Sequence, residues 1–104
     1  MPLNNPVQGI EISNPKSQSV IAVTLPSQTE AVLIAPNNLN RKGLSIHNAS
    51  NSRLYIDYSN QVTPQVFAKS VEPNSYFEIP FGYVGSVWGI WESLSGAALV
   101  REFI

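Results

Sequence analysis

Hydrophobic and polar residues alternate along most of the chain after residue 19. Clusters of Pro, Gly, Asn and Ser interrupt the alternation every eight to twelve residues or so. No window carries the i, i+3, i+4, i+7 spacing of an amphipathic helix. The pattern therefore predicts an all-β domain over residues 20–104, a small antiparallel β-sandwich or jelly-roll of about eight short strands. The predicted strands are residues 20–25, 30–35, 43–48, 54–58, 66–71, 75–79, 84–91 and 97–104.

Two successive strands are predicted to form a hairpin. In residues 43–48, Leu and Ile alternate with Ser45 and His47, and in residues 54–58 the odd-numbered Tyr55 and Asp57 alternate with an inward apolar set. The intervening segment is rich in Asn and Ser, which favour turns. We therefore expect these two strands to pair with each other.

The strand at residues 84–91 differs from the others because both of its faces are apolar. Trp88 and Trp91 lie on opposite faces, and each has an aliphatic neighbour on its own face. Such a strand is either covered on both sides or keeps one face for a partner. Gly85 and Gly89 lie in line on one face, where their missing side chains leave room for a large ring.

Residues 1–19 have a different composition and predict an extended N-terminal arm. They contain three prolines and only a few aliphatic residues, too few to form a core of their own. Ile10 and Ile12 alternate with Glu11, a pattern that suits a strand added to the edge of another sheet. The surface that holds the arm is either its own domain or a neighbouring subunit.

The chain carries little charge. Charged residues make up 12% of it, against about 25% in a typical globular protein. Ten Asn and thirteen Ser supply much of the polar surface instead, and the formal net charge is −1. Because the basic residues are scattered, we expect no direct nucleic acid binding. No apolar stretch approaches the roughly 18 residues of a membrane span, so we expect no membrane contact.

The size of the chain favours assembly. A chain of 104 residues without cysteine has a marginal single core and no disulfide to support it. Small domains of this kind commonly gain stability by oligomerisation. We therefore expect a homo-oligomer, either a dimer or a trimer.

The candidate catalytic residues are few. His47 is the single histidine, and Ser45 beside it and Asp57 across the predicted hairpin formally complete a triad. A flat strand face, however, offers neither a strained nucleophile turn nor an oxyanion site. One His without Cys makes no zinc site, and the carboxylates lack the spacing of a calcium loop. We therefore predict no catalytic residues, no cofactor and no metal, although the sequence leaves a paired-carboxylate hydrolase open.

Aromatic residues concentrate in one part of the chain. Six of the ten lie within sixteen residues: Tyr76, Phe77, Phe81, Tyr83, Trp88 and Trp91. One interpretation is a binding platform for sugar rings or for a protein partner. The other is the hydrophobic core of a small sandwich.

Two segments together resemble small virion proteins of tailed bacteriophages, a class that includes capsid decoration, or cement, proteins. The segments are residues 41–58, and residues 75–91 continued by residues 96–102. The resemblance implies a non-enzymatic structural protein with a β-sandwich or jelly-roll body. It would be made in the host cytoplasm, would form homo-oligomers, and would bind neighbouring major capsid proteins on the capsid surface.

On this interpretation the partner-binding residues fall into two groups. Ile10 and Ile12 of the arm bind the capsid or a sister subunit, and Tyr83, Trp88 and Trp91 pack at the oligomer seam. Two alternatives stay open. A phage neck, tail or baseplate component would use the same surfaces in fewer copies, and a small carbohydrate-binding module would need one of the two tryptophans exposed.

Overall fold

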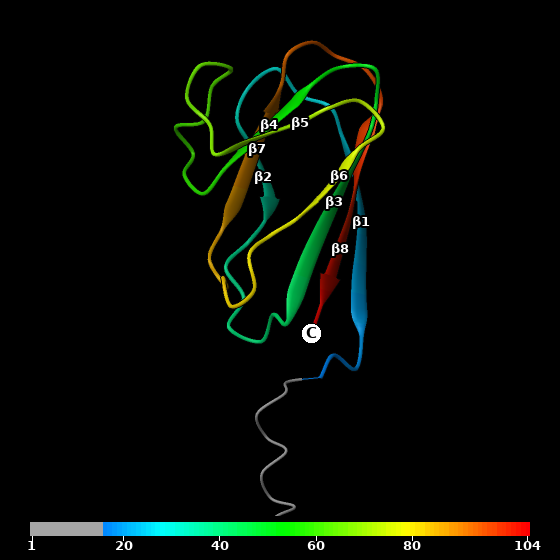
Figure 1. Ribbon diagram of the computed structural model, residues 1–104, viewed down its shortest axis with the longest axis vertical. Coiled ribbons are helices and arrows are strands. Elements are labelled where there is room, and N and C mark those ends of the chain that lie inside the picture. The colour runs from blue at the N-terminus through cyan, green and yellow to red at the C-terminus, as the bar shows by residue number, and fades with distance from the viewer. Residues whose placement is uncertain (1–15) are drawn as a thin grey trace, which may run out of the picture.

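The computed structural model describes residues 16–104, which form eight strands and no helix (Figure 1). The strands are β1 (Val20–Pro26), β2 (Val32–Ala35), β3 (Gly43–Ala49), β4 (Leu54–Asp57), β5 (Lys69–Val71), β6 (Tyr76–Glu78), β7 (Val87–Trp91) and β8 (Ala97–Phe103). Each lies within or beside a segment of alternating hydrophobicity. The prediction of an all-β domain with eight short strands is confirmed.

The strands form two four-stranded antiparallel sheets. Sheet A has the order β1-β8-β3-β6, and sheet B has the order β2-β7-β4-β5. In Figure 1, sheet A lies on the right and sheet B on the upper left. The predicted sandwich is therefore present. Four of the antiparallel pairs join the first strand to the eighth, the second to the seventh, the third to the sixth and the fourth to the fifth.

The core lies between the sheets and contains side chains from both. In β3 and β8, every second residue is buried and the residues between them are half-buried. The largest fully buried apolar side chains are Trp91, Ile46, Leu54, Ile56, Val71, Val87 and Val100. Each contributes about 1.5–3 kcal/mol by leaving water, so this contact between the sheets is the main stabilising interaction of the fold.

The predicted hairpin between residues 43–48 and residues 54–58 is wrong. β3 pairs with β6 and β8 in sheet A, whereas β4 pairs with β5 and β7 in sheet B. The connection between them crosses from one sheet to the other. Its path is fixed by the buried Asn48, whose side-chain amide donates to the carbonyls of Ser52 at 2.8 Å and Val71 at 2.9 Å. The apolar faces of the two strands therefore meet across the core.

The strand with two apolar faces is covered on both. β7 is an inner strand of sheet B, and its Val87 and Trp91 face the core. On the opposite face, Ile90 and the half-buried Trp88 pack with Tyr55 and Val62, and Val62 comes from the long loop between β4 and β5.

One of the two predicted glycine sites holds an aromatic ring. A side chain at Gly85 would collide with the ring of Tyr83. At Gly89 the neighbouring side chains are the aliphatic Ile34 and Leu54 instead. The missing side chains therefore serve close packing at both positions, but only one of them accommodates a ring.

The start of the described chain lies beside its end. The backbone N–H groups of Gln18 and Ser19 donate to the carbonyl of Ile104 at 2.8 and 3.1 Å, and the N–H of Ile104 donates to Ser19 O at 2.9 Å. Gln18 and Ser19 of the predicted arm thus continue the pairing of β1 with β8. Ile10 and Ile12, the predicted partner-binding residues of the arm, lie outside the described residues.

Candidate interaction surface

The outer face of sheet A is an open surface in the described part of the chain. The register of the strands defines its residues, because Ser45 of β3 stands between Arg101 of β8 and Glu78 of β6. The outward side chains are Val20, Ala22, Thr24, Ser45, His47, Tyr76, Glu78, Leu99, Arg101 and Phe103. None of them is buried. We call this set the outer face of sheet A.

This face is mainly uncharged. Arg101 and Glu78 flank Ser45 from its two sides, so their opposite charges balance. The other members are apolar residues, hydroxyl residues and His47, and Tyr76 is largely exposed at the β6 edge. A flat, mixed surface of low charge with an exposed aromatic ring has the composition of a protein interface.

A groove of about 290 Å³ lies at one end of the outer face, where the chain leaves β6. Gly43 and Ser45 form part of its floor, and Phe81 and Phe103 are among its walls. Gly43 contributes no side chain, and Phe103 packs beside it. Phe81 is 81% exposed, an unusual state for a large apolar ring. Lys42 and Glu78 also line the groove, which therefore offers a partner both apolar rings and charged groups.

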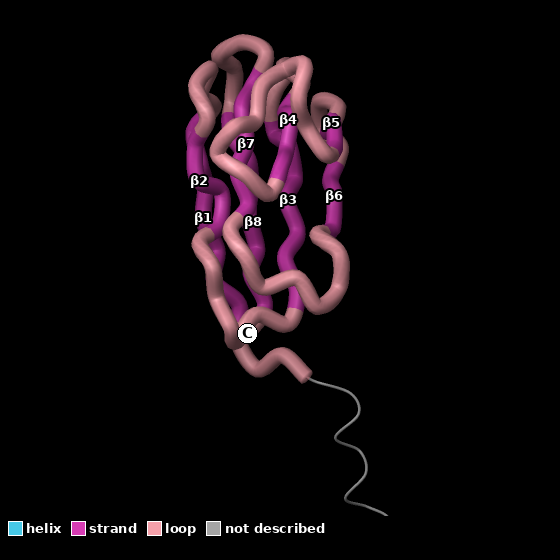
Figure 2. The backbone as a smooth tube through the Cα atoms, turned by 90° about the vertical axis from the view of Figure 1, so that its left-hand side faces the viewer, coloured by secondary structure: helices cyan, strands magenta, loops and turns pink. Residues whose placement is uncertain are grey.

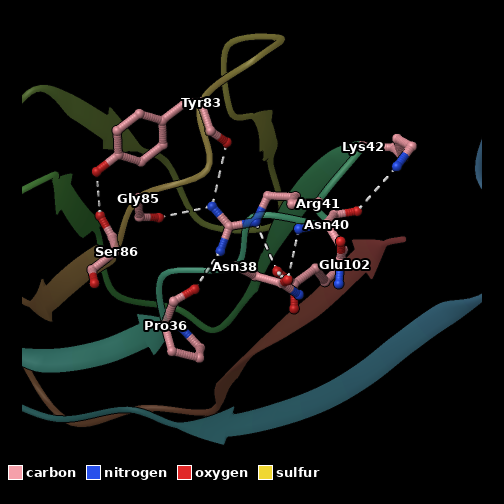
Figure 3. Close-up of polar contacts among 9 residues, drawn as sticks. All are labelled: Pro36, Asn38, Asn40, Arg41, Lys42, Tyr83, Gly85, Ser86 and Glu102. Carbon is pink, nitrogen blue, oxygen red and sulfur yellow. Dashed lines mark hydrogen bonds and ion pairs between the residues drawn. The ribbon is translucent and has the colours of Figure 1, made fainter. Parts of the chain in front are cut away.

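A buried ion pair fixes the loops around this end of the sandwich (Figure 3). Arg41 Nε donates to Glu102 Oε2 at 2.7 Å, and both side chains are almost completely buried. The guanidinium also donates to the carbonyls of Pro36 at 2.6 Å and Gly85 at 2.8 Å. Asn38 Nδ2 donates to the same carboxylate oxygen at 3.3 Å. One side chain thus ties the β2–β3 loop and the β6–β7 loop to β8.

The structure removes Trp91 from the surface. Its side chain is 1% exposed, and its indole N–H donates to Asn48 Oδ1 at 3.3 Å. A side chain this deeply buried cannot contact a partner, so the prediction that Trp91 packs at an oligomer seam is wrong. Trp91 is buried because its face of β7 is the one that packs against sheet A.

The other two predicted seam residues are half-buried in separate places. Trp88 belongs to the small cluster outside sheet B, and Tyr83 packs edge-on against Tyr58 with ring centroids 4.8 Å apart. The Tyr83 hydroxyl donates to Ser86 O at 2.7 Å. The structure does not bring Tyr83, Trp88 and Trp91 together on one surface.

Sequence reasoning missed which aromatic residues are exposed. Tyr76 and Phe81 are the two most exposed large aromatics of the described residues. A signal for Phe81 was available, because it stands between Pro80 and Gly82 and such a Pro-x-Gly sequence is typical of a turn tip. Gly82 has a φ of 90°, as that turn requires.

The formal triad does not assemble. Ser45 and His47 lie on the outer face of sheet A, but Asp57 lies on β4 in sheet B. Packed sheets are about 10 Å apart, too far for a carboxylate to orient the imidazole. Asp57 instead accepts the backbone N–H of Tyr58 at 2.8 Å. These three residues therefore form no catalytic unit.

A polar cleft of about 540 Å³ at the opposite end contains two carboxylates. Arg53 Nε is 3.0 Å from Glu72 Oε2, and its NH1 is 4.0 Å from Glu92 Oε1. The Tyr55 hydroxyl donates to Glu92 at 2.9 Å. Hydrogen bonding to Tyr55, and next to Glu72, raises the pKa of Arg53. All three charged side chains are largely exposed, whereas a paired-carboxylate hydrolase holds its general acid in an enclosed apolar site.

The chain matches no family model, no curated protein and no solved structure. Within residues 16–104, no group of three His, Cys, Asp or Glu side chains is placed to hold a metal ion. The same residues include no helix long and apolar enough to cross a membrane. The outer face of sheet A, with its groove, is therefore the surface from which we infer a function.

Proposed function

We propose that the protein is a non-enzymatic capsid decoration protein that binds neighbouring major capsid proteins and stabilises a phage head. The observation that carries the proposal is the open outer face of sheet A, which ends in a groove of mixed polar and apolar lining beside the exposed Phe81. A shell component needs a broad, weakly charged surface rather than a deep pocket. The resemblance of residues 41–58, 75–91 and 96–102 to small virion proteins supports the same role.

The strand order supports a jelly-roll. An antiparallel ribbon that pairs strand one with eight, two with seven, three with six and four with five, and then rolls up, gives two such sheets. The contacts of β3 with β8 and of β4 with β7 close the roll. Viral capsid proteins and lectins both use this architecture, so the fold alone does not separate the two functions.

The groove favours a protein partner over a sugar. Carbohydrate sites stack a sugar on an exposed ring and surround it with hydrogen-bonding groups. Trp91 is buried, and Trp88 is half-covered by the cluster outside sheet B. Phe81 stands beside the apolar Phe103 and the bare backbone of Gly43. Lys42, Ser45 and Glu78 also line the groove, so its lining suits a peptide segment with both apolar and polar side chains.

Quantitative mass spectrometry of purified particles from the source tests the role. The number of copies of this chain is compared with that of the most abundant shell protein. Near-stoichiometric copies, or a simple fraction of them, are the expected result. A handful of copies per particle would assign the protein to the neck, tail or baseplate, and absence from the particles would overturn the virion function.

A pair of variants tests the groove itself. Phe81→Ser removes an exposed ring from the groove, and Leu94→Ser removes a comparably exposed side chain from the β7–β8 loop. We expect the first to weaken binding to particles stripped of this protein at least about tenfold, since an aromatic interface anchor contributes more than about 1.4 kcal/mol. Leu94→Ser should bind like the parent protein. Equal binding by both variants in a sedimentation assay would exclude the groove as the contact.

A further inference from the structure

β1 is an edge strand with little of the usual protection, since only Pro26 at its end is a residue that blocks strand pairing. Among the described residues it pairs only with β8, in a continuous register from Val20 to Pro26 without a bulge. Its seven residues include no charge. Natural edge strands are normally shortened, bulged or charged, because unpaired backbone groups invite another strand. A long, flat and uncharged edge is therefore a surface that needs a partner strand.

The hydrogen-bonding groups of this free edge can be assigned. Ser19 exchanges hydrogen bonds with Ile104, and the N–H of Ser27 donates to Gly96 O at 3.0 Å. Antiparallel pairing alternates, so odd-numbered residues of β1 direct their backbone groups at β8 and even-numbered residues direct theirs outward. Within residues 16–104, Val20, Ala22 and Thr24 therefore present N–H and C=O groups that no other strand pairs. Pro26 has no N–H, which an outward position tolerates.

The apolar side chains beside this edge are also uncovered. Ile21 and Val23 point to the core side of sheet A, since their partners on β8 are the buried Glu102 and Val100. They are nevertheless 42% and 41% exposed. Sheet B therefore does not fully cover β1. A partner strand beside β1 would bury both side chains as well as pairing the backbone.

We propose that this partner is β1 of a second copy, paired antiparallel about a two-fold axis at Ala22. Ala22 then faces Ala22 of the second copy, and Val20 faces Thr24 of the second copy. All outward N–H groups of both strands find acceptors, which gives about six hydrogen bonds. The two copies of sheet A become one sheet of eight strands.

The side chains fit this register. On the core side, Ile21 lies opposite Val23 of the second copy, so the two exposed aliphatic pairs cover each other. Pairing about a two-fold axis would bring any charged residue of β1 close to the same residue of the second copy, where the two like charges would repel. β1 contains no charged residue, so this repulsion is absent. The proposal specifies the surface of the expected homo-oligomer. It rests on the geometry of the edge and not on the virion role, so each can fail without the other.

Single cysteines test the register, because the chain contains no cysteine of its own. In Ala22→Cys the two introduced thiols face each other, with Cα atoms about 5.5 Å apart, within the range of a disulfide. The matched control is Thr24→Cys on the same edge and the same face. In the proposed pairing, the thiols introduced at position 24 of the two chains lie about 13 Å apart along the strand, too far for a disulfide. Under mild oxidation we expect a covalent dimer from the first variant and monomer from the second.

The double variant Val20→Cys with Thr24→Cys checks the register again. The proposed pairing places the thiol at position 20 of one chain opposite the thiol at position 24 of the second copy. The double variant should therefore cross-link, although Thr24→Cys alone does not. Equal cross-linking of Ala22→Cys and Thr24→Cys, or none by Ala22→Cys, would overturn the proposal.

Light scattering on the full chain gives a second readout without thiols. We expect the parent protein to dimerise between micromolar and millimolar concentration, and Ala22→Lys to remain monomeric because two cations meet at the axis. The control Val66→Lys places the same charge on an exposed residue of the loop outside sheet B and should still dimerise. Unchanged thermal melting would show that Ala22→Lys is folded.

Three outcomes would contradict pairing through β1. The parent protein could be monomeric throughout the concentration range, or Ala22→Lys could dimerise as well as the parent. Dimers that form only after removal of residues 1–15 would identify that segment, and not a second copy, as the occupant of the edge.

Discussion

The two sheets present very different outer surfaces. On sheet B, the loop of residues 58–68 folds over β4 and β7, so Tyr55, Val62 and Ile90 are buried outside the main core. Figure 2 looks onto this side, where loops lie in front of β4 and β7. On sheet A, the described residues leave the whole outer face exposed or half-buried.

This difference assigns the outer side of sheet B to the stability of the fold and the outer side of sheet A to interaction with partners. The small cluster outside sheet B completes the packing of that sheet within one chain, and its buried members Tyr55, Val62 and Ile90 offer little surface to a partner. Sheet A carries its free edge and its groove on the side where nothing of residues 16–104 covers them. We therefore expect substitutions outside sheet B to change the free energy of unfolding, and substitutions outside sheet A to change binding.

The largest loss of stability is expected at the ion pair that joins both sheets. Glu102→Ala leaves the almost fully buried Arg41 without its carboxylate. Removing one partner of a buried pair costs about 3–5 kcal/mol, so we expect that decrease in the free energy of unfolding measured with urea.

Arg101→Ala is the matched control, since Arg101 is the neighbour of Glu102 in β8 but points to the outer face of sheet A. It should change the free energy of unfolding by less than about 0.5 kcal/mol. A comparable loss in both variants would show that the outer face of sheet A contributes to stability as the core does.

A smaller loss is expected within the loop that covers sheet B. Val62 is 2% exposed and Val66 is 56% exposed, although both belong to the same loop. Val62→Ala should lower the free energy of unfolding by about 1–3 kcal/mol, because it leaves a cavity under the loop. Val66→Ala should change it by less than about 0.5 kcal/mol. Equal effects in urea denaturation would mean that the loop does not pack on sheet B as described.

The smallest expected effect is a dependence of stability on pH that comes from Tyr58, the residue after β4. Burial, then the nearby Tyr83 and Asp57, raises the pKa of Tyr58 above 10.0. The unfolded chain therefore loses this proton first as the pH rises, so the stabilisation is complete below about pH 9 and is lost above pH 10. Tyr58→Phe should unfold like the parent at about pH 8 and should be less sensitive to urea than the parent at about pH 10.5. An identical alkaline loss in both proteins would contradict this shift.

The candidate surface was only partly predictable. The alternation of Ser45 and His47 with inward Leu44 and Ile46 fixed which side chains leave the core, and this parity holds in β3. The same alternation could not say that β4 crosses to the other sheet. Alternation also places Glu102 inward, in line with Ala98 and Val100, so the burial of this charge could be predicted from the sequence. Its partner Arg41, 61 residues earlier, could not.

By itself, the sequence determined the strands, their inward faces and the low charge of the surface, because these depend on the identity of residues two apart along one strand. The tertiary structure decided which strands pair, which outer face the loop covers, and that Trp91 is buried while Phe81 is exposed. The physical reason is that a strand presents equivalent edges and two faces to any neighbour. Only the closure of the whole chain determines which of them is covered, through contacts between residues far apart in sequence.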